Sequence, residues 1–138
     1  MCPPVTVAGD EELLRRAVEN VIRNAIRYSP RDTAVQVNLA RDHERALVTV
    51  RDHGPGVPED ALPRLFDPFY RVESDRNRTS GGIGLGLSIA RRAIELYKGT
   101  IRARNMQPGL EVDLELPSVD TPGGNLPHTI RERTSKPA

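Results

Sequence analysis

The stretch SGGIGLGLSIARRAIELYKG, residues 80–99, places Gly81, Gly82, Gly84 and Gly86 directly before a strongly patterned helix. Glycine in a helix costs roughly 0.5–1 kcal/mol relative to alanine, so a benefit is expected to offset this cost. Exposed N–H groups and the positive end of the helix dipole make such a helix start suitable for binding an anion. The spacing is neither that of a Walker P-loop nor G-x-G-x-x-G, and glycines can also serve as hinges.

The composition narrows the function classes. The chain has 138 residues, enough for one domain with one core, and its net charge of +1 gives no strong field for nucleic acid or a membrane surface. Aromatic residues make up 4% and tryptophan is absent, which further disfavours base stacking. The single cysteine, Cys2, cannot build a disulfide framework, so a reducing compartment fits.

Two long helices are predicted. Asp10 is a suitable cap for a helix that runs to about Tyr28, because apolar residues recur in pairs every four positions. The second helix is expected from about Gly84 to Lys98, with Gly99 as its C-terminal stop. A short helix is also expected to start at Pro58.

Strands are predicted between these helices and at both ends. Residues 4–9 indicate a short strand, and the alternation in 33–41 and 45–52 predicts an antiparallel hairpin. Residues 100–106 and 110–117 indicate two more strands around a QPG turn. The inward positions of the first hairpin are expected to be Val35, Val37, Leu39, Leu47 and Val50.

This order of elements predicts the α/β class, a two-layer sandwich with helices on one face of a mixed, mostly antiparallel sheet. We expect a short leader at residues 1–4, one domain over residues 5–117 and a disordered tail over residues 118–138. The tail is rich in proline, glycine and polar residues, which disfavours a packed core.

Polar side chains border the buried stripe of the first helix. Asn20 and Asn24 are four residues apart and share a face, and Arg27 and Tyr28 fall on the same border. A carboxamide oxygen is a neutral, hard ligand that suits Mg²⁺ beside nucleotide phosphates. The two asparagines could equally be ordinary surface residues, and the pattern alone leaves both interpretations open.

Two further segments carry candidate chemistry. In DHGPG, residues 52–56, the Asp52 carboxylate could accept a hydrogen bond from a purine amino group, although a plain turn after a strand explains the segment equally well. In FDPFYR, residues 66–71, Phe66 and Phe69 are expected to anchor a long polar loop, and Arg71 is a candidate phosphate ligand. The three histidines match neither a nucleophile–base pair nor a metal cluster, so they are expected to be non-catalytic.

In order, the chain reads NVIRNAIRY, DHGPG, FDPFYR and GGIGLGL. This series resembles the N, G1, F and G2 boxes of the catalytic and ATP-binding domain of sensor histidine kinases. That family belongs to a wider group that includes gyrase, Hsp90 and MutL. The phrase FYR…SGGIGLGLSIARRAI is similar to Cpx-type sensors. The resemblance covers residues 5–117 and implies the Bergerat ATP-binding fold with a mobile ATP lid.

The resemblance implies a role for each matching residue. Asn24 would coordinate Mg²⁺, and Asn20 would position phosphates or water. Arg27 would contact phosphate, Tyr28 would pack against adenine, and Asp52 would accept from the adenine amino group. The implied catalytic residues are Asn20, Asn24 and Arg71, and the remaining nucleotide-binding residues are Arg27, Tyr28, Asp52, Gly54, Gly56, Phe69, Gly82, Gly84, Leu85 and Gly86.

The resemblance also implies the reaction and its partners. The domain would bind Mg²⁺ and ATP and pass the γ-phosphate to a histidine on a separate dimerisation domain, for relay to a response regulator. The phosphoacceptor motif does not occur in the sequence, so the isolated domain is expected to be a monomeric half of an enzyme. The parent protein would be anchored in the inner membrane with this domain in the cytoplasm, and no nucleic acid is expected to bind.

Two other functions remain possible from the sequence. A serine kinase of the anti-sigma-factor type would share the fold, and a module with a decayed nucleotide site would share it without activity. His53 stands where the family often has Asn or Asp, which leaves its own role open. Asn20 stands where gyrase-like relatives place a water-activating Glu, so weak ATP hydrolysis is expected.

Overall fold

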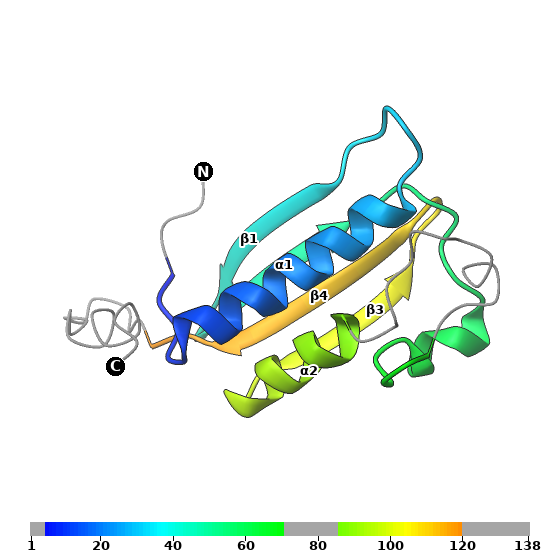
Figure 1. Cartoon of the computed structure of the whole chain (residues 1–138). Coiled ribbons are helices and arrows are strands. Elements are labelled where there is room, and N and C mark those ends of the chain that lie inside the picture. The colour runs from blue at the N-terminus through cyan, green and yellow to red at the C-terminus, as the bar shows by residue number, and fades with distance from the viewer. Residues whose placement is uncertain (1–4, 71–85, 120–138) are drawn as a thin grey trace.

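The structure is a computed structural model that describes residues 5–70 and 86–119. Its elements follow the predicted order, with two α-helices, four strands and one short 3₁₀ helix in the described residues (Figure 1). Their bounds are α1 Glu11–Tyr28, β1 Gln36–Asp42, β2 Arg45–Arg51, η1 Glu59–Arg64, α2 Gly86–Leu96, β3 Thr100–Asn105 and β4 Leu110–Pro117.

The four strands form one sheet in the order β1-β2-β4-β3. All three strand pairs of the described chain are antiparallel. Helices α1 and α2 lie side by side on one face of this sheet, as Figure 1 shows. The predicted two-layer α/β sandwich is therefore confirmed, and no parallel strand pair occurs in the part of the chain described.

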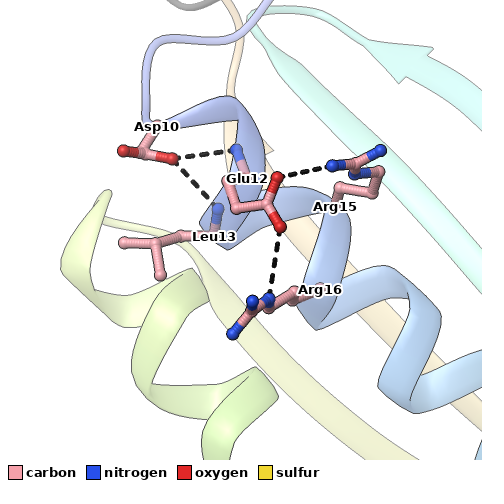
Figure 2. Close-up of polar contacts among 5 residues, drawn as sticks. All are labelled: Asp10, Glu12, Leu13, Arg15 and Arg16. Atoms are coloured by element: carbon pink, nitrogen blue, oxygen red, sulfur yellow. Dashed lines mark hydrogen bonds and ion pairs between the residues drawn. The ribbon is translucent and has the colours of Figure 1, made fainter. Parts of the chain in front are cut away.

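Helix α1 begins where the sequence predicts it. The Asp10 side chain is the cap, because its Oδ1 accepts the backbone N–H groups of Glu12 at 2.8 Å and Leu13 at 3.1 Å (Figure 2). Glu12 in turn pairs with Arg15 and Arg16 on the exposed side of the first turn. Its hydrogen bond to Arg15, together with that positive charge, lowers the pKa of Glu12. All these groups are exposed at the surface.

The core lies between the helices and the inner face of the sheet. Val21 of α1, Ile94 of α2, Val50 of β2 and Leu114 of β4 are its largest fully buried side chains. Burying a side chain of this size stabilises the fold by about 1.5–3 kcal/mol. The core thus joins α1 and α2 to the two central strands.

The prediction of which residues of the β1–β2 hairpin face inward is partly wrong. Leu47 faces the outer side of the sheet, beside Glu115 of β4, whereas Val50 is buried in the core. Side chains alternate along a strand, so two residues three positions apart cannot share a face. Val37 and Leu39 do lie opposite inward residues, but they stay 48% and 44% exposed because β1 is an edge strand.

The end of α2 differs in detail from the prediction. Lys98, with φ of 67°, takes the left-handed position of the cap, and the N–H of Gly99 donates to the carbonyl of Ile94 at 2.9 Å. Gly99 is required for another reason. A Cβ there would lie 2.3 Å from the backbone oxygen of Glu115, so glycine allows α2 to end against β4.

The segments at the domain's edges pair with each other. The strand predicted over residues 4–9 is reduced to a single bridge between Val7 and Ser118. The N–H of Val119 donates to the carbonyl of Thr6 at 2.9 Å, next to this bridge. The division into leader, domain and tail remains a prediction. None of the described helices is both long and apolar enough to cross a membrane.

Candidate functional site

Asp52 lies directly after β2 and is the best-defined polar group of the candidate site. The residue is only 3% exposed. Its Oδ1 accepts the N–H groups of Gly54 at 2.9 Å and Leu110 at 3.1 Å, and its own N–H donates to the Leu110 carbonyl at 3.0 Å. Within the described chain Oδ2 accepts no hydrogen bond. The carboxylate is therefore held in one orientation, with one oxygen left to accept from a ligand.

Close backbone approaches surround this carboxylate. A Cβ at Gly54 would lie 2.2 Å from the backbone oxygen of Tyr28, the last residue of α1. Gly109, in the turn between β3 and β4, has φ of 104°, and a Cβ there would lie 1.9 Å from the backbone oxygen of Asp52. Only glycine fits at both positions without a shift of the backbone. The end of α1, the loop after β2 and the β3–β4 turn thus meet at Asp52.

Asn105 and Gly109 belong to this end of the molecule, although the sequence analysis did not select them. Asn105 ends β3, and its carboxamide forms two hydrogen bonds with the backbone of Val57 in the loop after β2. Asparagine is uncommon in strands, and this was the available signal. The QPG turn indicated the position of Gly109 but not its contact with Asp52.

The other end of the candidate site is formed by α1 and the start of α2. Asn20 and Asn24 are both half-buried on α1. Gly86 is the first residue of α2, and among the described residues a Cβ there would meet only the Cβ of Asn20, at 4.0 Å. The two helices thus bring Asn20 beside a helix N-terminus, where an anion is favoured.

These residues fit the cofactors implied by the sequence. The oxygens of Asn20 and Asn24 are neutral, hard donors of the kind that Mg²⁺ takes beside phosphates. Oδ2 of Asp52 can accept from an amino group, and Arg27 and Tyr28, the last two residues of α1, are half-buried at the same end of the site. The donor set is therefore suited to a magnesium nucleotide.

The remaining predicted residues fall into two groups. Phe66 is buried in the core as expected, whereas Phe69 is 68% exposed with φ of 66°, so it does not anchor the loop by packing into the core. The predictions for the other group lie outside the described residues. That group comprises Arg71, Gly82, Gly84 and Leu85.

His53 has a structural explanation. Its Nδ1 lies 3.0 Å from the carbonyl oxygen of Ala34, so this nitrogen is the donor. The bond ties the loop after β2 to the segment before β1. That His53 is non-catalytic remains a prediction.

Charged groups on the outer face of the sheet support β4 behind the site. Glu111 is 7% exposed and accepts two hydrogen bonds from Arg104 of β3, at 2.5 and 3.0 Å. Burial, reinforced by the charge of Glu111, raises the pKa of Asp113. Glu111 directly follows Leu110, whose N–H holds Asp52. The pair with Arg104 therefore secures the strand end on which the carboxylate depends.

Comparison with known proteins agrees with this geometry. Residues 9–120 match the family model for histidine kinase-, DNA gyrase B- and HSP90-like ATPases. The chain is 46% identical to sensor protein PfeS of Pseudomonas aeruginosa over 105 residues and 41% identical to sensor histidine kinase CpxA of Escherichia coli over 106 residues. These matches cover 76% and 77% of this chain and 23% of each relative.

A solved structure shares the fold. The mycobacterial sensor histidine kinase MprB superimposes with a TM-score of 0.73 at 34% sequence identity, covering 83% of this chain and 81% of that one. The sheet, its two covering helices and the buried carboxylate define a two-layer α/β domain of the ATP-binding class. The chain belongs to the family of histidine kinase-, DNA gyrase B- and HSP90-like ATPases. The resemblance to sensor histidine kinases, Cpx-type sensors included, is confirmed. The chain spans about a quarter of the length of these two curated relatives.

Proposed function

We propose that this domain is the catalytic half of a two-component sensor histidine kinase. It binds Mg·ATP and presents the γ-phosphate to a histidine on a separate dimerisation domain, for relay to a response regulator. The observation that carries the proposal is the buried Asp52 carboxylate, with Oδ1 fixed by Gly54 and Leu110 and Oδ2 left to a ligand. A polar side chain buried in this way costs stability unless it is hydrogen-bonded, and a ligand bonded to Oδ2 would offset that cost.

The base of the nucleotide is assigned to the Asp52 end. Adenine carries an amino group that can donate to Oδ2, whereas guanine carries a carbonyl oxygen at the same ring position and would face the carboxylate with an acceptor. The close approach of Gly54 to Tyr28 brings the end of α1 next to this point. The ring of Tyr28 would then contact the purine.

The phosphates are assigned to the end formed by α1 and α2. Asn20 and Tyr28 are eight residues apart on α1, about 12 Å along the helix axis. This distance is comparable to the length of one nucleoside triphosphate. Asn24 would hold Mg²⁺, while Asn20 and the N–H groups at the start of α2 would meet the phosphates. Mg²⁺ would neutralise phosphate charge during transfer.

The same residues favour transfer over hydrolysis. Hydrolysis needs a base that activates water, and Asn20 is not a base. Glu19 is exposed, one position away from the half-buried border on which Asn20 and Asn24 lie. We therefore propose that the domain hydrolyses ATP slowly and keeps it for transfer by positioning and charge neutralisation.

The first experiment is a calorimetric titration of the chain with Mg·ATP. The wild-type domain is expected to bind. Asn24→Ala should weaken binding with Mg²⁺ present and change it less with EDTA, which separates a metal ligand from a general binding residue. Absence of Mg·ATP binding by the wild type at millimolar concentration would refute the proposed function.

The second experiment tests the acceptor. The chain is mixed with [γ-³²P]ATP and a separately purified dimerisation domain of a sensor kinase such as CpxA. Acid-labile, base-stable phosphate on that domain is expected, as for phosphohistidine. Acid-stable phosphate on serine of a partner protein would instead indicate a serine kinase of the same fold.

The assembly and location follow the same proposal. The isolated domain is proposed to be monomeric, with its dimer formed through the dimerisation domain, and light scattering of the purified chain tests this. The parent protein is proposed to be anchored in the inner membrane with this domain in the cytoplasm. Both proposals rest on the similarity to sensor kinases.

A further inference from the structure

We propose that Asn105 is a positioning residue that determines how strongly the site prefers adenine. The proposal rests on the nucleotide-binding function proposed above. Asn105 is the last residue of β3 and lies half-buried at the Asp52 end of the sheet. It acts on the base through the loop after β2 and not by touching the nucleotide.

The carboxamide of Asn105 binds the loop through both of its polar atoms. Oδ1 accepts the N–H of Val57 at 2.9 Å, and Nδ2 donates to the carbonyl of the same residue at 2.7 Å. These two bonds reproduce the exchange that opposed residues make in an antiparallel ladder. The second N–H of Nδ2 donates to Glu59 at the start of η1, at 2.9 Å. One side chain thus fastens the loop to both the sheet and η1.

This contact closes the far end of the loop that carries Asp52. At one end Asp52 is fixed by Leu110 of β4, and at the other Val57 is fixed by Asn105. Gly56, with φ of 75°, lies between them, and a Cβ there would lie 2.7 Å from Oδ1 of Asn105. A loop fixed at both ends has fewer conformations than one fixed at a single end.

The restricted loop holds the carboxylate in position for the base. The N–H of Gly54 donates to Oδ1 of Asp52 from within this loop. Releasing Val57 would let Gly54 move, and the carboxylate would lose one of the two bonds that aim Oδ2. The affinity for an amino group at that point should therefore fall. The phosphate end, on α1 and the start of α2, is formed by other elements and should be unaffected.

Two nucleotides that differ in one amino group test this inference. Purine riboside 5′-triphosphate lacks the 6-amino group of ATP and keeps the same sugar and phosphates. The full 138-residue chain is titrated with each nucleotide and Mg²⁺. The wild type should prefer ATP by about tenfold or more, because an acceptor left unpaired in a buried site weakens binding. In Asn105→Ala the preference should fall below about threefold, mainly through weaker ATP binding.

Matched variants separate positioning from general destabilisation. Asn38→Ala removes an exposed asparagine from β1 and should leave the preference unchanged. Glu59→Ala removes only the third hydrogen bond of Asn105 and should keep most of the preference. Asn105→Asp keeps the acceptor for the Val57 N–H but loses both donated bonds, so it should resemble Asn105→Ala. If Asn105→Ala does not fold, as judged by circular dichroism, Asn105→Asp is used in its place.

The outcomes distinguish this proposal from the proposed function. A wild-type chain that does not bind Mg·ATP refutes the nucleotide-binding function and this proposal with it. A wild-type chain that binds both nucleotides equally refutes the proposed contact between the adenine amino group and Asp52, and the role of Asn105 with it. A folded Asn105 variant that weakens the binding of both nucleotides by the same factor overturns the role of Asn105 alone. A folded Asn105 variant whose affinity for ATP falls more than its affinity for purine riboside 5′-triphosphate supports the proposal.

Discussion

The two ends of α1 are built differently. At its start, the Asp10 cap and the Glu12 ion pairs are side-chain contacts between neighbouring residues at the surface (Figure 2). At its other end, Tyr28 meets Gly54 with no space for a methyl group, and the buried Asp52 lies next to this contact. The contacts at the first end stabilise the helix, and other residues could provide them. The second positions a candidate ligand group and depends on glycine and on backbone contacts.

The largest effect should come from a methyl group added behind Asp52. Gly109→Ala combines a left-handed φ of 104° with a contact of 1.9 Å to the Asp52 backbone oxygen, so we expect it to destabilise the domain. The loss should be about 3 kcal/mol or more, or folding should fail, as measured by urea denaturation. Gly86→Ala is the matched control, because a Cβ there comes no closer than 4.0 Å to any other part of the described chain. Equal stability of the two variants would contradict the comparison.

Asp52→Asn should separate binding from folding at the buried end. The asparagine can keep the Oδ1 bonds to Gly54 and Leu110, but it would present an N–H₂ group where Oδ2 accepted. ATP affinity should fall about 10- to 100-fold in a calorimetric titration, while the melting temperature changes little. A large loss of stability with unchanged affinity would mean that Asp52 serves the fold alone.

Asp10→Ala should show the opposite behaviour at the exposed end. It removes the acceptor for the first free N–H groups of α1 and should destabilise the domain by about 1 kcal/mol in chemical denaturation. ATP affinity should be unchanged once the protein is folded. Asp10→Ser, which restores a capping oxygen, should recover most of the stability. A binding defect in Asp10→Ala would contradict the separation of the two ends.

The smallest effect is expected from Glu12→Gln. Because the folded-state pKa of Glu12 is lowered, its ionised form contributes stability above the ordinary value of 4.5, and this contribution is lost as the pH falls through the folded-state pKa. The variant should therefore be slightly less stable than the wild type at neutral pH and equal to it in acid. Since both partners are exposed, high salt should also remove the difference. A difference that persists in acid would assign another role to Glu12.

The same contrast explains what the sequence could predict. The cap at Asp10 and the helix that follows depend on neighbours within four residues, and both were predicted correctly. Asn105 was missed because its partner Val57 is 48 residues away and no local pattern connects them. Leu47 was assigned to the wrong face because hydrophobicity outweighed the strict alternation of a strand. The candidate residues were identified from motifs, but the contacts that hold Asp52 became visible only when β2 and β4 were paired.

The pairing of β2 with β4 has a consequence for how the domain folds. Each hairpin closes a short segment, whereas the bond between Asp52 and Leu110 closes 58 residues and carries a larger loop-closure entropy. Such long-range contacts slow folding, so we expect the Asp52 end to form only when the two hairpins dock. A ligand at Asp52 would then bind only the docked state and stabilise it by mass action. Nucleotide concentration would thus set how often the two halves of the sheet separate.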